Sequence, residues 1–173
     1  YKCGATTNAM TSYDITGYYI TTASDHIEKQ LDILSDMLFN SQFKGIKSEK
    51  DVVISENKMN ETSPDDKLVM LFNGLIFKGT TFEHDTGGLN KDIRKFTKKD
   101  VIDFYNKYYS PNNIVISICG KVPKNITKLV EKYFNKKRKN NFFEEDEYQN
   151  FRCLQTKPRF LSLIEDVDQA QIM

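Results

Sequence analysis

The 173-residue sequence predicts an α+β fold in which an antiparallel-rich sheet packs with helices on one face. Two observations lead to this prediction. The N-terminal segment is rich in small, β-branched and aromatic residues, which is typical of a β-hairpin. Several later segments have apolar residues at helical spacing, and short continuous apolar runs lie between them. A chain of this length is most simply one domain, so we expect a single domain over residues 1–173.

The elements follow in order along the chain. A hairpin is predicted over residues 5–22, with its turn near Tyr13 and Asp14. Capping signals and apolar spacing predict helices that begin near Asp25, at 47, at Ser63 with Pro64, at Thr97 with Asp100, and near Ile126. Residues 78–96 read as a long loop and 139–155 as a polar linker. Strands are predicted at 114–119, 159–165 and 169–173.

Composition excludes several classes of function. Charged residues make up 28% of the chain, and the net charge of +1 gives no general attraction to nucleic acid or to an acidic membrane. No apolar run reaches the roughly 20 residues that span a bilayer, so membrane insertion is not expected. The three cysteines are widely spaced and unpaired in pattern, which indicates a reducing, intracellular location. The basic run at 136–139 follows a helix end and is expected to be solvated.

Two acidic residues stand out in the segment KSEKDVVISENKM, residues 47–59. Glu49 and Glu56 are seven residues apart, so on a helix they lie roughly 20° apart on one face. Val52, Val53 and Met59 fall on the same side, which places both acids within the apolar stripe. Either the helix is rotated so that both carboxylates are solvated at the edge of the stripe, or at least one is buried against a cation.

The residues alone do not define a metal site. A catalytic zinc ion needs three protein ligands and one open position. The sequence has two histidines, His26 and His84, without the spacing of a metal motif, and no cysteine pair. A convergence of His26, His84 and Glu56 is conceivable, but a capping or loop role is the simpler interpretation of each histidine.

Three stretches together resemble the insulinase, or pitrilysin, family of inverted zinc metallopeptidases, which includes the mitochondrial processing peptidases. They are TTNAMTSYDITGYY, SEKDVVISENKM followed by SPDDK, and FTKKDVIDFYNKYYSPNNIVISICGKV. The resemblance extends over nearly the whole chain. It implies a zinc-dependent metalloendopeptidase and one homologous half of a clamshell-shaped peptidase.

The resemblance also implies roles for the two acids. Glu56 corresponds to the glutamate that is the third zinc ligand of the family. Glu49 corresponds to a second glutamate that supports the site from outside the ligand set. The family's His-x-x-Glu-His motif, which supplies two zinc ligands and the general base, is expected about 20 residues before Tyr1, outside this sequence. The chain is therefore expected to be an N-terminally truncated domain that contributes Glu56 to a zinc ion whose other ligands lie elsewhere.

The resemblance further implies a substrate strand and a partner. Asn8 and Ala9 correspond to the strand along which an extended peptide binds by β-addition. Residues 166–173 are expected to begin a strand leading to a second, homologous domain or subunit. Two other functions remain open: a non-catalytic scaffold or substrate-binding subunit of the same family, and an unrelated α+β interaction module. The cleaved peptides and the particular compartment, cytoplasmic or mitochondrial, do not follow from the sequence.

Overall fold

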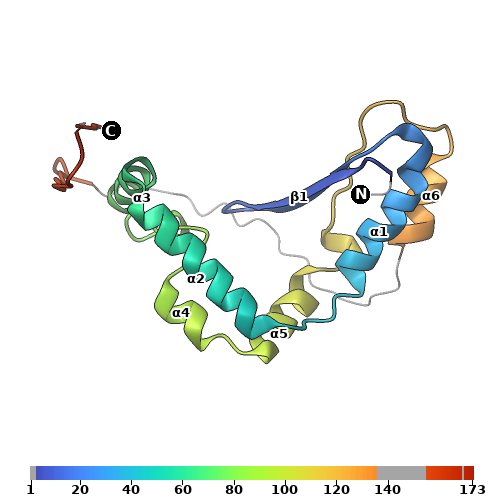
Figure 1. Ribbon diagram of the computed structural model, residues 1–173, viewed down its shortest axis with the longest axis horizontal. Coiled ribbons are helices and arrows are strands. Elements are labelled where there is room, and N and C mark those ends of the chain that lie inside the picture. The colour runs from blue at the N-terminus through green and yellow to red at the C-terminus, as the bar shows by residue number, and fades with distance from the viewer. Residues whose placement is uncertain (1–2, 136–154, 169) are drawn as a thin grey trace. The chain divides into compact units, whose positions relative to one another are not determined.

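The computed structural model describes residues 3–135, 155–168 and 170–173, and it divides into two compact units. The first unit comprises Tyr1–Thr11, Ile15–Lys44 and Thr97–Glu147, and the second comprises Ser12–Asp14, Gly45–Phe96 and Tyr148–Met173. The described residues contain six α-helices, α1 to α6, and a two-stranded antiparallel sheet (Figure 1). The α+β class is confirmed, although the sheet is smaller than the sequence predicts.

The predicted hairpin is confirmed in the first unit. Strand β1 (Thr6–Thr11) pairs antiparallel with β2 (Thr16–Thr21), with Asn8 opposite Tyr19 and Ala9 opposite Tyr18. Threonine makes up half of β1, and β2 consists of threonine, tyrosine and isoleucine apart from Gly17, as the preference of these residues for strands predicts. The hairpin therefore fixes the register of the strand on which Asn8 and Ala9 lie.

Helices α1 (Ile27–Phe39) and α6 (Ile126–Phe134) form the core of the first unit. Four apolar side chains are buried together: Leu31, Leu38, Leu129 and Phe134. The predicted Asp25 cap is wrong, because the chain enters α1 through a 3-10 turn, Ser24–His26, and no side chain caps the helix. Glu28 instead accepts hydrogen bonds from Lys132 at 2.8 Å and Tyr133 at 3.1 Å, and these lower the pKa of the Glu28 carboxyl.

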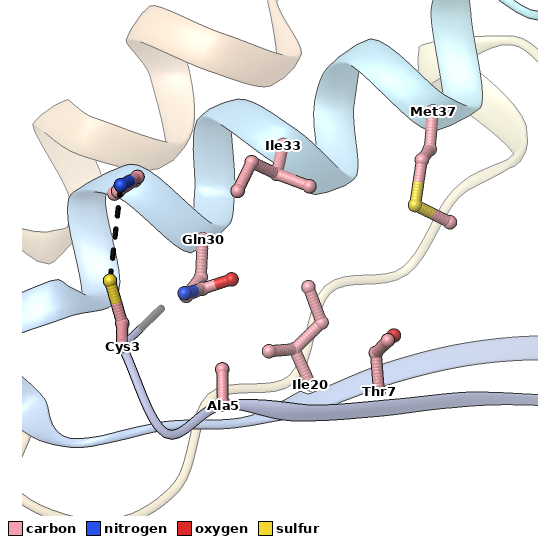
Figure 2. A pocket seen from close by; sticks show the side chains of 8 residues that line it. Cys3, Ala5, Thr7, Ile20, Gln30, Ile33 and Met37 are labelled. Carbon is pink, nitrogen blue, oxygen red and sulfur yellow. Dashed lines mark hydrogen bonds between the residues drawn. The ribbon is translucent and has the colours of Figure 1, made fainter. Parts of the chain in front are cut away.

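A cavity of about 300 Å³ lies between the hairpin and α1 within this unit (Figure 2). Ile33 and Met37 project from α1, and Ala5, Thr7 and Ile20 project from the hairpin toward them. The Lys29 ammonium hydrogen-bonds the Cys3 thiol at 3.8 Å at one end of the cavity. Because strand residues alternate between faces, Asn8 belongs to the hairpin face opposite the one that carries Thr7.

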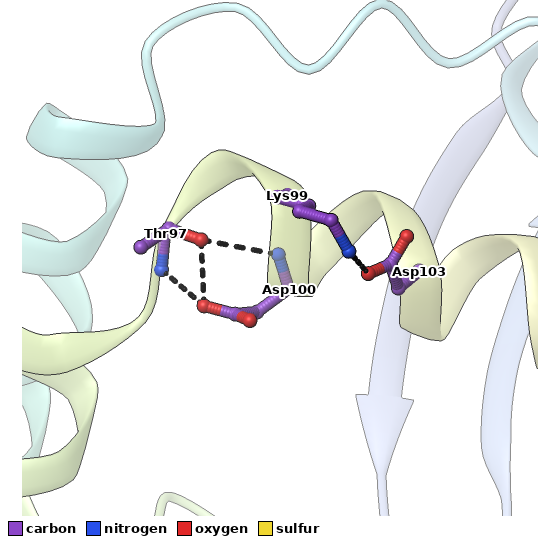
Figure 3. Close-up of polar contacts among 4 residues, drawn as sticks. All are labelled: Thr97, Lys99, Asp100 and Asp103. Carbon is purple, nitrogen blue, oxygen red and sulfur yellow. Dashed lines mark hydrogen bonds and ion pairs between the residues drawn. The ribbon is translucent and has the colours of Figure 1, made fainter.

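Helix α5 (Lys98–Tyr108) begins at the capping box that the sequence predicts (Figure 3). The Asp100 amide donates to the Thr97 hydroxyl at 3.3 Å, and the Thr97 amide donates to the Asp100 carboxylate at 2.7 Å. The Thr97 hydroxyl also donates to the Asp100 carboxylate, at 2.7 Å, and this bond, together with the bond from the Thr97 amide, lowers the pKa of the Asp100 carboxyl. The carboxylate's stabilising contribution is therefore present above the ordinary aspartate pKa and is lost only as pH falls through the lowered value. Lys99 pairs with Asp103 one turn along the helix.

Tyr105 joins α5 to α1. Its ring is only 7% exposed and packs against Phe43 at 4.9 Å between centroids, and its hydroxyl donates to the Leu38 carbonyl at 2.7 Å. A buried carbonyl that loses its donor costs free energy, so this hydroxyl matters beyond the packing of its ring.

Replacing Tyr105 with phenylalanine is expected to lower the free energy of unfolding by about 1–2 kcal/mol, because the Leu38 carbonyl loses its hydrogen bond while the ring packing is kept. Urea denaturation of the protein measures this change. The control is Tyr19→Phe, since Tyr19 is 52% exposed on the hairpin, and it is expected to change little. Equal effects of the two variants would contradict this account of Tyr105.

The second unit contains α2 (Ile46–Thr62), α3 (Pro64–Ile76) and α4 (Asn90–Lys95). The predicted start of α3 is confirmed: Ser63 accepts a hydrogen bond from the Asp66 amide at 3.4 Å, and Pro64 is in the first turn. The prediction that residues 78–96 form a loop is wrong in part, because they contain a 3-10 turn, Thr81–Glu83, and α4. No side chain caps α4, so the usual signal for a helix start is missing there.

The three later strands predicted from apolar runs are not formed in the described residues. Residues 114–119 have no strand partner, although Ile116 and Ile118 pack against the first unit's core and Val115 is 96% exposed. Residues 155–168 and 170–173 contain neither helix nor strand. Arg159 bonds the Leu75 carbonyl of α3, and Glu165 pairs with Lys67. An apolar run specifies an extended, inward-facing segment, but a strand also needs a neighbour to complete its ladder of hydrogen bonds.

The predicted linker at 139–155 falls almost wholly outside the described residues, as do the basic run and Cys153. Cys3 and Cys119 are free thiols. Within the part of the chain that the structure describes, no helix is long and apolar enough to cross a membrane. The single-domain assignment and the role of 166–173 as the lead into a second domain stay predictions.

Candidate functional site

Glu49 and Glu56 lie on α2, in the second unit, and both side chains are exposed. Glu49 is in the first turn, just after Gly45, which adopts the left-handed conformation with φ 77° at the helix start. Neither carboxylate has a hydrogen-bond or ion-pair partner among the described residues. The helical spacing places both on one side of α2, two turns apart, where they can act together.

The expectation that these acids stand in the middle of a buried stripe is wrong for the described chain. Val52 is 49% exposed and Met59 is 66% exposed, whereas the buried side of α2 is centred on Ile54, which is 5% exposed. The alternative in which both carboxylates are solvated at the edge of the stripe describes their exposure. The hydropathy pattern misplaced the buried side because two polar residues, Lys50 and Asn57, contribute to it.

Lys50 connects α2 to the end of α4. Its ammonium donates to the Arg94 carbonyl at 2.7 Å and to the Phe96 carbonyl at 2.8 Å. The last carbonyls of a helix have no partner within the helix and carry the negative end of its dipole, so a lysine at this place is favourable. Lys50 as a whole is half-buried, and its two hydrogen bonds are exposed.

Asn57 makes the second polar connection, two turns later. Its amide donates to the Gly88 carbonyl and to the Asn90 side-chain oxygen, both at 3.1 Å. The loop backbone approaches so closely that a Cβ atom on Gly87 would lie 2.4 Å from the Asn57 side-chain oxygen. Sequence reasoning missed Lys50 and Asn57; their seven-residue spacing and the Gly87-Gly88 pair were the available signals.

Asn8 and Ala9 lie on β1, in the first unit, and both are exposed. The Asn8 side-chain oxygen accepts a hydrogen bond from the Ala9 amide at 2.9 Å. The described sheet has only β1 and β2, so β1 has a strand neighbour on one side within that part of the chain. Asn8 and Ala9 therefore lie in the first unit, and Glu49 and Glu56 lie in the second.

The described residues do not form a complete metal site. No group of three or more histidine, cysteine, aspartate or glutamate side chains in this part of the chain is placed to hold a metal ion. His26 belongs to the first unit, whereas His84 and Glu56 belong to the second. The donor set fits zinc only as a partial one: Glu56 offers an accessible, unpartnered carboxylate, and the remaining ligands have to come from outside the described residues.

Family models match both halves of the chain. The model described as "Insulinase (Peptidase family M16)" matches residues 1–88, and the one described as "Peptidase M16 inactive domain" matches residues 95–173. The chain belongs to the insulinase family, peptidase family M16. The family resemblance in the sequence is thereby confirmed.

Relatives within the family have different names. The chain is 34% identical over 139 residues to an uncharacterized zinc protease, YmxG, of Bacillus subtilis. It is 32% identical over 130 residues to the mitochondrial-processing peptidase subunit beta of Dictyostelium discoideum. It is 26% identical over 135 residues to cytochrome b-c1 complex subunit 1 of Bos taurus. These matches include 77%, 74% and 76% of this chain but only 33%, 27% and 28% of the relatives, so the chain spans a third of their length or less.

A solved structure supports the fold. The crystal structure of a protease from Helicobacter pylori superimposes with a TM-score of 0.75 at 27% sequence identity. The match covers 83% of this chain and 35% of that protease. The arrangement described above is therefore that of an M16-type peptidase fold.

The close packing of Gly87 against Asn57 leads to a prediction about stability. Gly87→Ala is expected to push the Asn57 amide away and lower the free energy of unfolding by about 1 kcal/mol, because the amide loses its hydrogen bonds to the loop. In an Asn57→Ala background the same change is expected to cost little, since the side chain that it displaces is gone. Thermal or urea unfolding of the unchanged protein, the two single variants and the double variant measures this coupling.

The matched control is Gly74→Ala in α3, where a new Cβ meets no atom within 4 Å. That change is expected to be neutral or stabilising, because alanine has the higher helix propensity. Equal costs of Gly87→Ala with and without Asn57 would show that the two residues are not coupled.

Proposed function

We propose that the chain is part of a zinc-dependent metalloendopeptidase in which Glu56 is a zinc ligand and Glu49 supports it. The observation that carries this proposal is that both carboxylates, on one side of α2, are exposed and have no partner among the described residues, in a chain of the insulinase family. A carboxylate ligand must be accessible to the metal, and this condition is met where the side chain is open to solvent.

Each residue has a distinct part in this proposal. A bound zinc ion would polarise the scissile carbonyl and lower the pKa of a bound water. Glu56 would supply one oxygen ligand. Glu49, two turns away on the same side, would orient the neighbouring ligands through hydrogen bonds. The ligands and the general base that complete the site would lie in the His-x-x-Glu-His motif expected upstream of Tyr1.

The substrate would bind to the hairpin. An extended peptide would pair with β1 at Asn8 and Ala9, so that backbone bonds supply affinity and side-chain pockets supply selectivity. The exposure of every residue of β1 supports this role, because no part of the described chain covers the strand. A second homologous domain or subunit would close over the peptide, and the protein would act inside the cell.

A non-catalytic role in the same family is the alternative. It is favoured by the match of residues 95–173 to the model described as an inactive domain and by the similarity to a subunit of the cytochrome b-c1 complex. In that case the chain would be a scaffold or substrate-binding subunit and Glu56 would bind no metal. The zinc content of the full-length protein separates the two roles.

The decisive measurement is zinc retention in the full-length protein encoded by the native gene. We expect one zinc ion per active site, a His-x-x-Glu-His sequence upstream of Tyr1, and loss of zinc in Glu56→Gln. Glu49→Gln is expected to retain zinc better, since an outer carboxylate typically changes metal affinity by about 10–100-fold rather than abolishing it. The readout is metal content after dialysis against a chelator.

Glu61→Gln is the matched control, because Glu61 is an exposed acid on the same helix but at a different angle. It is expected to retain zinc like the unchanged protein. Equal retention in Glu56→Gln and Glu49→Gln would sink the ligand assignment, and a protein that binds no zinc at all would favour the scaffold role.

A second experiment tests the substrate strand. Asn8→Ala is expected to raise the KM for peptide hydrolysis by roughly two- to tenfold with a smaller change in kcat, the effect of losing about one hydrogen bond to the bound peptide. Thr21→Ala on β2 is the control, because it removes an exposed polar group from the other strand of the hairpin. An unchanged KM in Asn8→Ala would remove Asn8 from the substrate site.

A further inference from the structure

We infer that Lys50 and Asn57 are positioning residues that set the rotation of α2 and thereby aim Glu49 and Glu56. The inference rests on the proposed function, since it takes Glu56 as a metal ligand. Neither residue has a role in the family resemblance, and both emerge from contacts within the second unit.

Each residue ties α2 to the segment that runs from the loop at 87–88 through α4. Lys50 holds two carbonyls at the C-terminal end of α4, and Asn57 holds the loop and Asn90 at its N-terminal end. Ile54, the buried residue of α2, lies between them in sequence, and Ile93 is the buried residue of α4. One side of α2 is thus hydrogen-bonded to both ends of α4.

Two attachment points along one line of a helix prevent both sliding and rotation. Lys50 and Asn57 are seven residues apart, so they lie along α2 within about 20° of each other. Glu49 and Glu56 each precede one of these residues by a single position, which places them about 100° further round the same helix. The polar contacts therefore fix the direction in which both carboxylates project.

The tolerance of a metal site makes this direction important. With side chains the radius of a helix is about 5–6 Å, so a rotation of 20° would move a carboxylate by about 2 Å. Metal–ligand distances are held to within about 0.2 Å. A hydrophobic contact such as Ile54 permits small rotations at little cost, whereas hydrogen bonds are directional and lose strength quickly when their angles change.

Other lysines of α2 provide matched controls. Lys47 and Lys58 are exposed on the same helix, and they make no hydrogen bond or ion pair with another residue of the described chain. Replacing either by methionine removes the same charge from α2 as Lys50→Met does. A general effect of helix charge would therefore appear in all three variants.

The experiment measures the rate at which the zinc-loaded full-length protein loses zinc to a chelator, together with its thermal unfolding. Lys50→Met and Asn57→Ala are each expected to speed zinc loss about tenfold or more, while Lys47→Met and Lys58→Met leave it unchanged. Lys50→Arg, which keeps the donors, is expected to restore slow loss. Hydrogen exchange of the metal-free protein is expected to rise at residues 85–96 in the Lys50 and Asn57 variants.

A positioning role also requires that the effect pass through Glu56. In a Glu56→Gln background titrated with excess zinc, Lys50→Met is expected to leave the residual zinc affinity unchanged, whereas a merely structural role would lower it. If Lys50→Met does not fold, Asn57→Ala decides in its place, since it removes only neutral hydrogen bonds.

The outcomes separate this inference from the proposed function. Fast zinc loss in Glu56→Gln with unchanged loss in Lys50→Met and Asn57→Ala would overturn the positioning role and leave the ligand assignment standing. Unchanged loss in Glu56→Gln would overturn the ligand assignment and the positioning role with it. Equal acceleration in Lys47→Met and Lys50→Met would reduce the effect to charge and also overturn the positioning role.

Discussion

The hydrogen bonds from α2 to residues 87–96 are the constraint on which the second unit depends. Alone, α2 has little reason to choose one orientation, because only Ile54 among its residues is buried and its apolar side chains are spread around the helix. Hydrogen bonds from Lys50 and Asn57 determine which side of α2 faces α4. The Lys50 ammonium in turn stabilises the short helix α4, which no side chain caps at its start, because it binds carbonyls at the C-terminal end of α4.

In the first unit, the packing of the helices supports a hairpin whose strand β1 is exposed. Leu31 and Leu38 of α1 pack with α6, and Tyr105 links α1 to α5 through the Leu38 carbonyl. One face of the hairpin looks onto α1 across the cavity that Thr7 and Ile20 line (Figure 2), and every residue of β1 is exposed. An exposed strand is what a surface that pairs with an extended chain requires.

Local signals in the sequence predicted much of this fold. Ser63 with Pro64 and Thr97 with Asp100 determine helix starts through contacts made within a few residues, so each could be read correctly. The rotation of α2 could not, because Lys50 and Asn57 find their partners more than 30 residues away. The same limit explains why the strand predicted at 114–119 is not formed in the described residues: its hydrogen-bond ladder depends on a neighbour that an apolar run cannot identify.

The extended segment at 114–118 has a consequence for handling the chain. Ile116 and Ile118 pack inward, while Val115 is almost wholly exposed and no described strand pairs with the segment. An extended segment with unpaired backbone N–H and C=O groups and apolar side chains can pair with another strand, including the same segment of another molecule. A preparation of this region alone would therefore be prone to concentration-dependent self-association.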